Sequence, residues 1–541
     1  MADGLRHLGV GRALALLVVA ASFGIAIAWP LARLAIETLG SGLGPFRAAL
    51  QPEGIEAIGN SLVVAVLVTV LALGGGMALA LLTEHAIVPA RGPLLAGILA
   101  PLLVPDYVSA LGWTRAFGPA GLLDRLTGLE LPGLYGPVGI VVVLAAGAVP
   151  LAYVLIVGGM RTRAEPDLTR AARMSGADGI TALRTVSLPL LWPVIAAAGG
   201  LIFATAMNAF GTPAVLGRPA GFATMTTRIY GDLAFSSADA AFERVLGLGF
   251  LLVAVVVVAV LLTGRLGPAL AERGSIGGPV GQLRPARRLP IALAWGFVLL
   301  TVGVPLLALL LTALTRAVGL PPLPENLTFA NFGRAIDSRT GPALLNSLVL
   351  AGLAAMICLA LGAVAVLAPN PAWRRRGGWL VTLGFAVPGS VLAIGTLLAF
   401  GRSLRDTLLI ILIAYVAKLW ALGERPIAAA VGRLSAAGAH AARIHGADAW
   451  TELRTVTLPL LVPTFAAAGL LVFIFALHEV TISILLYGPR TATLAVAILN
   501  LQQLGDPTVT TALAVLLTLL VVACGIPLLF LHRVLAASLR A

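Results

Sequence analysis

Long apolar runs separated by short polar loops dominate the pattern of this chain. Most of these runs reach the roughly 20 residues that an α-helix needs to cross a bilayer. The alternating ten-residue strands of a membrane β-barrel do not occur in the pattern. We therefore predict an all-α polytopic membrane protein. Its twelve or so spans are expected at 11–36, 58–83, 93–113, 137–159, 193–217, 242–263, 289–315, 343–368, 378–400, 407–424, 463–487 and 507–532.

The predicted spans divide into two similar halves. The stretch NSLVVAVLVTVLALGGGMALALL from Asn60 resembles NSLVLAGLAAMICLALGAVAVLA from Asn346. Between the halves, residues 264–288 are rich in Gly, Pro and Arg, which is typical of a flexible cytoplasmic linker. Six spans return the chain to its starting side, so the copies form a parallel repeat. We expect one transmembrane domain at 1–263 and a second at 289–541.

Composition agrees with a membrane protein and sets the orientation. Hydrophobic residues make up 59% of the 541 residues and charged residues 11%, where a soluble domain carries roughly 25% charged residues. The net charge of +13 would suit nucleic acid, but the basic residues are spread over many loops and form no single stripe. More of them face the cytoplasm if the N-terminus lies inside, so both termini are expected there.

One polar segment occurs twice, once in each half, and both copies fall on the predicted cytoplasmic side. RAARMSGADGITALRTVSLPLLWP begins at Arg170, and HAARIHGADAWTELRTVTLPLLVP begins at His440. In each copy a glycine, Gly176 or Gly446, suits the left-handed residue that ends a short helix. The same spacing in both halves is hard to obtain by chance, so the repeat indicates a function.

A second helix is predicted after each glycine. Asp178 and Asp448 can accept hydrogen bonds from the first amides of that helix. The helix then runs toward the membrane as far as the leucine-proline pairs that end at Pro189 and Pro459. Each copy is therefore a predicted helix–turn–helix that leads into a membrane span.

The doubled segment resembles the motif that marks permease subunits of binding-protein-dependent ABC importers: E-A-A, three residues, G, nine residues, I-x-L-P. The matching residues are Ala171, Ala172, Gly176, Val186, Leu188 and Pro189, and then Ala441, Ala442, Gly446, Val456, Leu458 and Pro459. The resemblance implies two coupling segments, 161–192 and 425–462, that each dock into a cleft on a separate ATPase subunit. Arg170 and His440 replace the glutamate of the motif.

Most of the remaining chain resembles one branch of that family. VPDYVSALGW from Val104, NAFGTPAVLG from Asn208 and HEVTISILLYGPRTATLAV from His478 are similar to permeases for ferric iron. This resemblance implies a bacterial inner-membrane importer of ferric iron, with thiamine, polyamines, phosphonates or inorganic oxyanions as the alternative solutes. It also implies a periplasmic solute-binding protein and an ATPase homodimer as partners. ATP and magnesium would bind to that ATPase, and no cofactor to this chain.

Functions of other classes explain less of the sequence. The chain has no G-x4-G-K-[ST] loop, so it cannot cradle nucleotide phosphates by that route and is not expected to be an enzyme. A secondary transporter driven by an ion gradient also tolerates twelve spans and a parallel repeat, but it leaves the doubled segment without a role. A membrane enzyme would need a motif such as H-E-x-x-H or a nucleophile elbow, and neither is found.

Polar residues of the fifth and eleventh predicted spans are candidates for a solute path, because polar groups at membrane depth usually face a cavity or a partner. Hydrogen bonding between helices is the alternative. The polar candidates are Thr205, Asn208, Thr212, His478, Glu479, Thr481 and Ser483, and Phe475 on the eleventh span is added to them. Adjacent helical residues do not share a face, so His478 and Glu479 alone would chelate a metal poorly and no metal site is assigned. Lys418 either extends toward the cytoplasm or pairs with a carboxylate such as Glu479.

Overall fold

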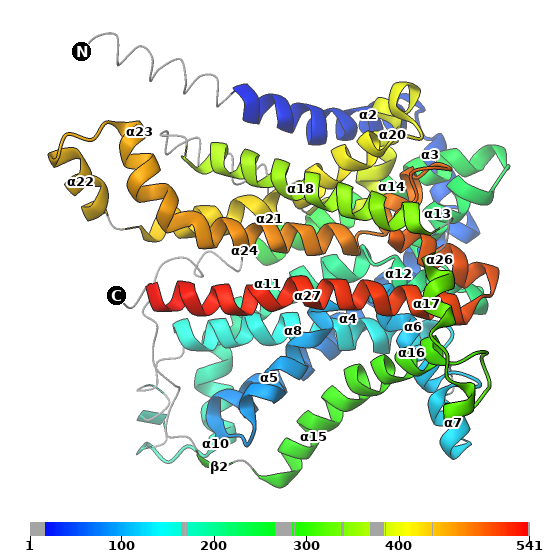
Figure 1. The fold of residues 1–541 in the computed structure, drawn as a ribbon, viewed down its shortest axis with the longest axis horizontal. Coiled ribbons are helices and arrows are strands. Elements are labelled where there is room, and N and C mark those ends of the chain that lie inside the picture. Colours follow the sequence, from blue (N-terminus) through cyan, green and yellow to red (C-terminus); the bar gives the residue numbers. More distant parts are fainter. Residues whose placement is uncertain are drawn as a thin grey trace. The chain divides into compact units, whose positions relative to one another are not determined.

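The described part of the protein is almost entirely helical in the computed structural model (Figure 1). The structure describes residues 17–538 apart from 129, 132, 164–167, 169, 170, 173, 266–283, 286, 337–339, 368–383, 385 and 435. Within these residues, nine helices are long and apolar enough to cross a membrane, and a bent pair makes a tenth candidate. The all-α polytopic fold is therefore confirmed, and a total of twelve spans is compatible with it.

The chain forms two compact units. One unit holds residues Leu43–Arg334 and Leu501–Val515, and the other holds Met1–Gly42, Ala335–Asn500 and Leu516–Ala541. The first of these, called the α4 unit here, contains α3 (Gly44–Ala49), α4 (Pro52–His85), α5 (Arg91–Leu99), η2 (Ala100–Leu103), α6 (Asp106–Phe117), α7 (Leu122–Thr127), α8 (Pro137–Arg163), α10 (Gly179–Ala182), η3 (Leu183–Ser187), α11 (Leu188–Met207), α12 (Gly211–Leu216), η4 (Arg218–Ala220), α13 (Met225–Phe235), α14 (Asp239–Arg265), α15 (Arg288–Val298), η6 (Leu299–Gly303), α16 (Val304–Leu314) and η7 (Pro324–Asn326).

The second, called the α18 unit, repeats much of this order. It contains η1 (Gly24–Ala28), α2 (Trp29–Gly40), α18 (Gly341–Leu367), α20 (Gly389–Leu404), α21 (Leu408–Arg433), α22 (Ala436–Ile444), α23 (Ala449–Glu452), η8 (Leu453–Thr457), α24 (Leu458–His478) and α25 (Thr481–Leu486). Three helices run across the boundaries between the units: α17 (Ala330–Ala335), α26 (Leu494–Leu504) and α27 (Pro507–Ser538). The two short strands, β1 (Ala86–Ile87) and β2 (Arg284–Pro285), pair in parallel within the α4 unit.

Each unit has the same three-helix centre. In the α4 unit α4, α8 and α11 pack on one another, and in the α18 unit α18, α21 and α24 do the same (Figure 1). An Asn-Ser pair holds the equivalent loop in both units. Asn60 donates to the carbonyl of Ala223 and Asn346 to that of Ala492. The neighbouring hydroxyls of Ser61 and Ser347 accept the amides of Met225 and Leu494, both at 2.8 Å. The repeat predicted from the two NSLV stretches is confirmed.

The first helix of each sequence half packs in the unit built mainly from the other half. In the α18 unit α2 packs on α20, and in the α4 unit α16 packs on α6. Both contacts place a proline against a glycine: a Cβ on Gly395 would lie 2.7 Å from the Pro30 carbonyl oxygen, and one on Gly112 would lie 3.1 Å from that of Pro305. The packing units therefore interleave in sequence. The boundaries 1–263 and 289–541 stay a prediction, and most of the 264–288 linker lies outside the described residues.

Several predicted spans differ from the observed helices. The single span expected at 93–113 is two helical segments, Arg91–Leu103 and Asp106–Thr127, bent by 110° at a break before Pro105. A proline has no amide to donate and disfavours helix in the residue before it, which explains the position of the break. The span expected at 407–424 continues through Arg425 to Arg433 as α21 and is not among the nine candidates.

Candidate functional site

The turn inside each coupling segment has the predicted left-handed glycine. Gly176 has φ +90° and Gly446 has φ +83°. The amide that follows each glycine reaches back to the first helix: Ala177 donates to the carbonyl of Ala172, and Ala447 to that of Ala442, both at 3.0 Å. This pattern is a Schellman motif, which satisfies the last carbonyls of a helix while the chain reverses. The predicted turn geometry is confirmed in both copies.

An aspartate then begins the second helix of each segment. The Asp178 carboxylate accepts the Thr181 amide and the Asp448 carboxylate accepts the Thr451 amide, both at 2.8 Å. The hydroxyl and amide of Thr181 lower the pKa of Asp178 below its ordinary value, because they bind its ionised form. Thr451 lowers the pKa of Asp448 in the same way. Both carboxylates therefore stay charged at neutral pH and hold the helix start.

A π-helical turn joins each second helix to its membrane span. Four such turns occur in the described part of the chain, at η1, η3, η6 and η8, and each ends two residues before a proline. Pro189 cannot donate to the carbonyl four residues before it, and its ring crowds that carbonyl. The preceding amide, of Leu188, donates instead to Leu183, five residues back, and Leu458 donates to Leu453 in the same manner. The helix thus passes through the proline without breaking, and continuous helix joins each second helix to its span.

Large apolar side chains protrude from both segments. Met174 is 89% exposed and Ile444, at the equivalent position, is 81% exposed. Trp450 on α23 is 65% exposed. Exposed apolar side chains grouped on a polar segment are typical of a protein contact surface. Our sequence analysis missed these residues, although the position two residues before each glycine is apolar in both copies.

Parts of the predicted segments lie outside the described residues. Arg170 is among them. In the second copy that helix is α22, with His440, Ala441 and an exposed Arg443 on it. Ala171 and Ala441 are exposed, while Ala172 and Ala442 are partly covered.

The second copy has an ion pair that the first copy cannot form. Arg443 and Glu452 join α22 to α23 with a nitrogen–oxygen distance of 2.9 Å. Glu452 also accepts the hydroxyl of Thr457, at 3.2 Å. The position of Glu452 is held in the first copy by Ala182, which is buried. The two segments therefore share their turn but differ in how their helices are fastened.

A buried carboxylate fixes the start of the first coupling segment. Glu84, with its side chain 3% exposed, accepts hydrogen bonds from Arg91 and Arg161, each at 2.8 Å. Arg161 lies at the end of α8, where the predicted segment 161–192 begins. The ion pairs connect the end of α8 to the turn between α4 and α5. Sequence reasoning missed this cluster because its members are far apart along the chain.

The spans that follow the coupling segments break at equivalent places. α11 ends at Met207 and resumes as the short α12, and α24 ends at His478 and resumes as α25. The continuous spans expected at 193–217 and 463–487 are therefore wrong in this respect. A carboxylate binds the second amide of each short helix: Asp106 accepts the Thr212 amide at 3.4 Å, and Glu479 accepts the Ile482 amide at 3.0 Å.

The α4 unit places its three path candidates around this break. The Thr205 hydroxyl donates to the carbonyl of Ile202 in its own helix. The side-chain oxygen of Asn208 is buried and has no hydrogen-bond partner among the described residues. Thr212 is fully buried, and its hydroxyl donates to the carbonyl of Asp106 at 3.1 Å. Thr212 thus fastens α12 to α6, and Asn208 is the candidate with an unused polar atom.

The α18 unit arranges its candidates around Tyr415. The Tyr415 hydroxyl donates to the carbonyl of Glu479 at 3.0 Å and lies 2.6 Å from the hydroxyl of Ser483, which is fully buried. Thr481 begins α25 and is half-buried. The Phe475 ring is tilted against the His478 ring at 6.2 Å between centroids, and Nε2 of His478 is buried without a partner among the described residues. His478 and Asn208 therefore hold equivalent places and both carry an unused polar atom.

Lys418 makes a contact that neither of our two expectations named: its Nζ donates to the carbonyl of Val387 at 2.8 Å. The backbone is not helical at Val387 and Pro388. The Val387 carbonyl is therefore available to accept a hydrogen bond from Lys418. Across the described residues, no group of three or more His, Cys, Asp or Glu side chains is placed to hold a metal ion.

Comparison with known proteins gives relatives of one kind. ABC transporter permease protein y4fN of Sinorhizobium fredii is 26% identical, over 80% of this chain and 79% of that protein. Ferric transport system permease protein FbpB of Actinobacillus pleuropneumoniae is 25% identical, over 84% of this chain and 67% of that protein. The 2-aminoethylphosphonate transport system permease protein PhnV of Salmonella paratyphi A is 30% identical, over 34% of this chain and 72% of that protein.

A protein-family model matches two ranges of residues in this chain. The model for the binding-protein-dependent transport system inner membrane component matches twice, at 87–273 and 356–541, which is more than half of the chain. Each match contains one coupling segment, and the two matches agree with the repeat in the fold. This chain therefore belongs to the binding-protein-dependent transport system inner membrane components, the multi-pass permease subunits of ABC importers, which have no ATPase activity of their own.

Proposed function

We propose that this permease imports ferric iron from the periplasm with energy from a separate ATPase homodimer that grips segments 161–192 and 425–462. The observation that carries the proposal is the doubled turn: the same left-handed glycine and the same aspartate cap occur in both segments. Two segments with the same turn would fit the two equivalent subunits of a homodimer. Both termini and both segments then lie in the cytoplasm.

The geometry suggests how motion reaches the membrane. ATP binding closes the ATPase subunits and moves the segments that they hold. Since η3 and η8 continue without a break into α11 and α24, each segment and its span move as one body. The spans break again at Asn208 and His478, so the same motion reorients the residues around α12 and α25. These breaks are the proposed solute path, which opens to alternate sides as the halves rock.

Iron as the solute rests on sequence resemblance. The ferric permease of Actinobacillus pleuropneumoniae aligns over 84% of this chain. A phosphonate is the second candidate, because the 2-aminoethylphosphonate permease is 30% identical over the 34% of this chain that it covers. Thiamine and polyamines are less favoured candidates for the solute. The iron would arrive on a periplasmic solute-binding protein, and this permease would carry it as cargo only.

ATP hydrolysis by the reconstituted complex tests the proposal. The permease is placed in liposomes with its ATPase, and a solute-binding protein is added with ferric iron, with 2-aminoethylphosphonate or with no solute. We expect the iron-loaded binding protein to raise the ATPase rate most. If the complex is stable and its ATPase rate rises with the phosphonate but not with iron, the solute is the phosphonate and not iron. A permease that bound no ATPase at all would contradict the coupling role itself.

A further inference from the structure

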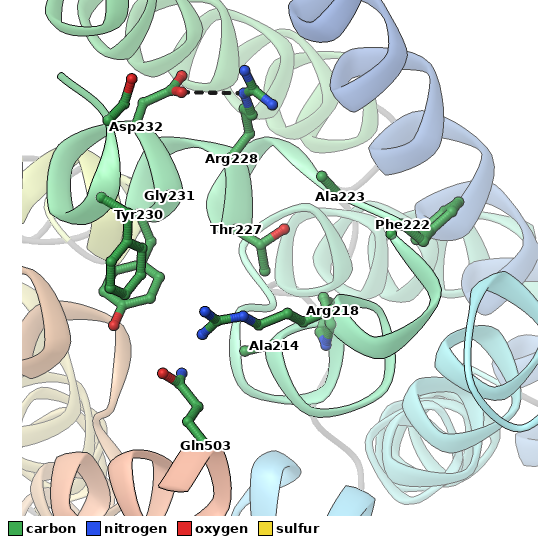
Figure 2. Close-up of a pocket in the computed structure, with 14 residues that line it drawn as sticks. Ala214, Arg218, Phe222, Ala223, Thr227, Arg228, Tyr230, Gly231, Asp232 and Gln503 are labelled. Carbon is green, nitrogen blue, oxygen red and sulfur yellow. Dashed lines mark ion pairs between the residues drawn. The ribbon is translucent and has the colours of Figure 1, made fainter. Parts of the chain in front are cut away.

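A cavity of about 430 Å³ opens at the end of the α4 unit opposite the first coupling segment. Its walls come from α12, η4 and α13, which follow the end of α11, and from Gln503 (Figure 2). The span Leu183–Met207 separates these walls from the coupling segment. If the coupling segment faces the cytoplasm, the cavity faces the periplasm. Its volume is within the roughly 300–1,000 Å³ of ordinary ligand pockets.

The cavity carries one positive charge that no carboxylate of the described residues neutralises. Arg218 is exposed, and it forms no ion pair with any residue that the structure describes. Its guanidinium carbon lies 5.2 Å from the centre of the Phe235 ring, which holds the side chain by a cation–π contact. Figure 2 shows the guanidinium directed between Tyr230 and the amide of Gln503. An arginine held in place with its donors unused is suited to bind a carboxylate or a similar oxyanion.

The other charges near the cavity balance one another. Arg228 pairs with Glu53 and with Asp232, the latter at 3.2 Å. Arg244 pairs with Asp232 at 2.6 Å and with Glu53 at 3.1 Å. Two arginines and two carboxylates thus form a neutral cluster that fastens α13 to α14 and to the start of α4. The cluster leaves Arg218 as the excess charge of the cavity.

Aromatic rings on one side of the cavity are held in place by stacking on one another. Tyr230 stacks edge-on between Phe210 and Phe235, with 5.4 Å between ring centres on each side. Phe235 nevertheless stays 62% exposed. Arginine and aromatic residues are enriched at the centres of protein interfaces, where they supply most of the binding energy. An exposed arginine on an exposed aromatic ring therefore favours a protein partner over a free small anion.

We propose that the cavity around Arg218 receives an acidic side chain, Asp or Glu, that the periplasmic solute-binding protein presents when it docks. The proposal rests on the function proposed above, because the binding protein and the periplasmic side both follow from it. The arginine makes paired hydrogen bonds to the carboxylate, and Phe235 covers the contact on one side. Charge recognition of this kind speeds encounter and fixes the orientation of the partner.

Binding measurements on three single variants test this docking site. The permease–ATPase complex in lipid nanodiscs is titrated with the binding protein that stimulates the wild type. We expect Arg218→Ala to weaken binding at least tenfold and to flatten its dependence on salt, and Arg218→Lys to fall between. Arg316→Ala removes an equal charge from an exposed arginine outside the cavity and should change affinity less than twofold. Unchanged affinity in Arg218→Ala, or equal losses in Arg218→Ala and Arg316→Ala, would overturn the proposal.

Two further measurements distinguish a docking defect from a folding defect, and a docking site from a site for small anions. Retention of the ATPase subunit and of the basal ATPase rate by Arg218→Ala shows that the variant is folded and that the coupling segments still work. Acetate and inorganic phosphate are then titrated onto the permease without binding protein. If either anion binds at Arg218 while docking is independent of that residue, the cavity is a small-anion site and the proposal is overturned. We expect neither anion to bind below roughly 10 mM, because a lone surface ion pair contributes little in water.

Discussion

The two coupling segments share their turns and differ in their fastenings. Gly176 and Gly446 adopt the same left-handed conformation, and an aspartate caps the next helix in each copy. Only the second copy adds the ion pair between Arg443 and Glu452. The first copy is fastened instead at its start, where Arg161 binds Glu84. The features common to both copies are those on which the proposed ATPase contact rests, and the others stabilise each segment locally.

Charged substitutions at the protruding apolar residues should have the largest effect. We expect Met174→Asp and Ile444→Asp each to weaken ATPase binding more than tenfold, because burying each apolar side chain contributes about 1.5–3 kcal/mol and a buried lone carboxylate adds a further cost. Subunit association in nanodiscs measures this. Leu126→Asp, at a residue 74% exposed on α7, is the matched control and should bind normally. If all three variants bind alike, the protruding residues are not the contact.

Removal of the left-handed glycines should come next. Gly176→Ala and Gly446→Ala place a side chain where φ is +90° and +83°, which costs about 1–2 kcal/mol. We expect the ATPase rate stimulated by the binding protein to fall by roughly 5–30-fold in each. Gly179→Ala makes the same change in a helix with open space around the new Cβ, and should leave the rate near that of the wild type. Equal losses at 176 and 179 would show that turn geometry is not what matters.

Loss of the aspartate caps should have a smaller effect than loss of the glycines. It should destabilise the second helix equally in the two segments. Asp178→Ala and Asp448→Ala leave the amides of Thr181 and Thr451 without their acceptor. We expect a several-fold loss of amide protection in the following helix by hydrogen exchange at neutral pH, with near-normal protection in the Asn variants, whose side chain also caps. If only one copy responds, the segments are not equivalent.

The caps should also respond to acid in a defined direction. The pKa of each aspartate is lower in the fold than the ordinary value of about 3.9, because the threonine hydroxyl and amide bind the ionised form. Their stabilisation is therefore complete above that value and is lost as the pH falls through the lowered pKa. Exchange measured between pH 2 and pH 6, and corrected for intrinsic rates, should show this loss in the wild type. Asp178→Asn should show none in the first segment, and a loss there would contradict the cap.

The ion pair should have the smallest effect and should act on one copy only. Glu452→Ala removes the contact with Arg443, whose side chain is 62% exposed, so we expect a loss of about 0.2–1 kcal/mol in local stability. Hydrogen exchange of α22 and α23 measures that loss, and residues 174–182 serve as the internal reference. A similar change in both segments would mean that the copies are coupled through the rest of the protein.

The sequence predicts the local features of this fold well. Helical spans follow from runs of apolar residues, and the glycine turns and aspartate caps follow from the backbone preferences of single residues. The matching spacing around Gly176 and Gly446 is therefore sufficient to locate both turns. These predictions need no knowledge of what lies next to each helix.

Contacts between distant segments could not be predicted in this way. The breaks at Asn208 and His478 coincide with polar residues within the two apolar runs, and hydrophobicity alone does not distinguish a helix break from a polar position in a continuous helix. The capping carboxylate comes from α6 in one unit and from the break itself in the other, which a search for repeated residues cannot find. The exchange of α2 and α16 between the sequence halves depends on packing alone. Each of these features needs the spatial neighbours of a residue to be known.

Cross-linking from the two protruding residues tests the central claim most directly. A photoreactive amino acid is placed at 174, at 444 or at 126 in the permease, and the complex with its ATPase is irradiated in liposomes. Our account predicts cross-links to the ATPase from 174 and from 444 in similar yield, and none from 126. Absence of ATPase cross-links from both 174 and 444, in a complex that still hydrolyses ATP, would contradict it.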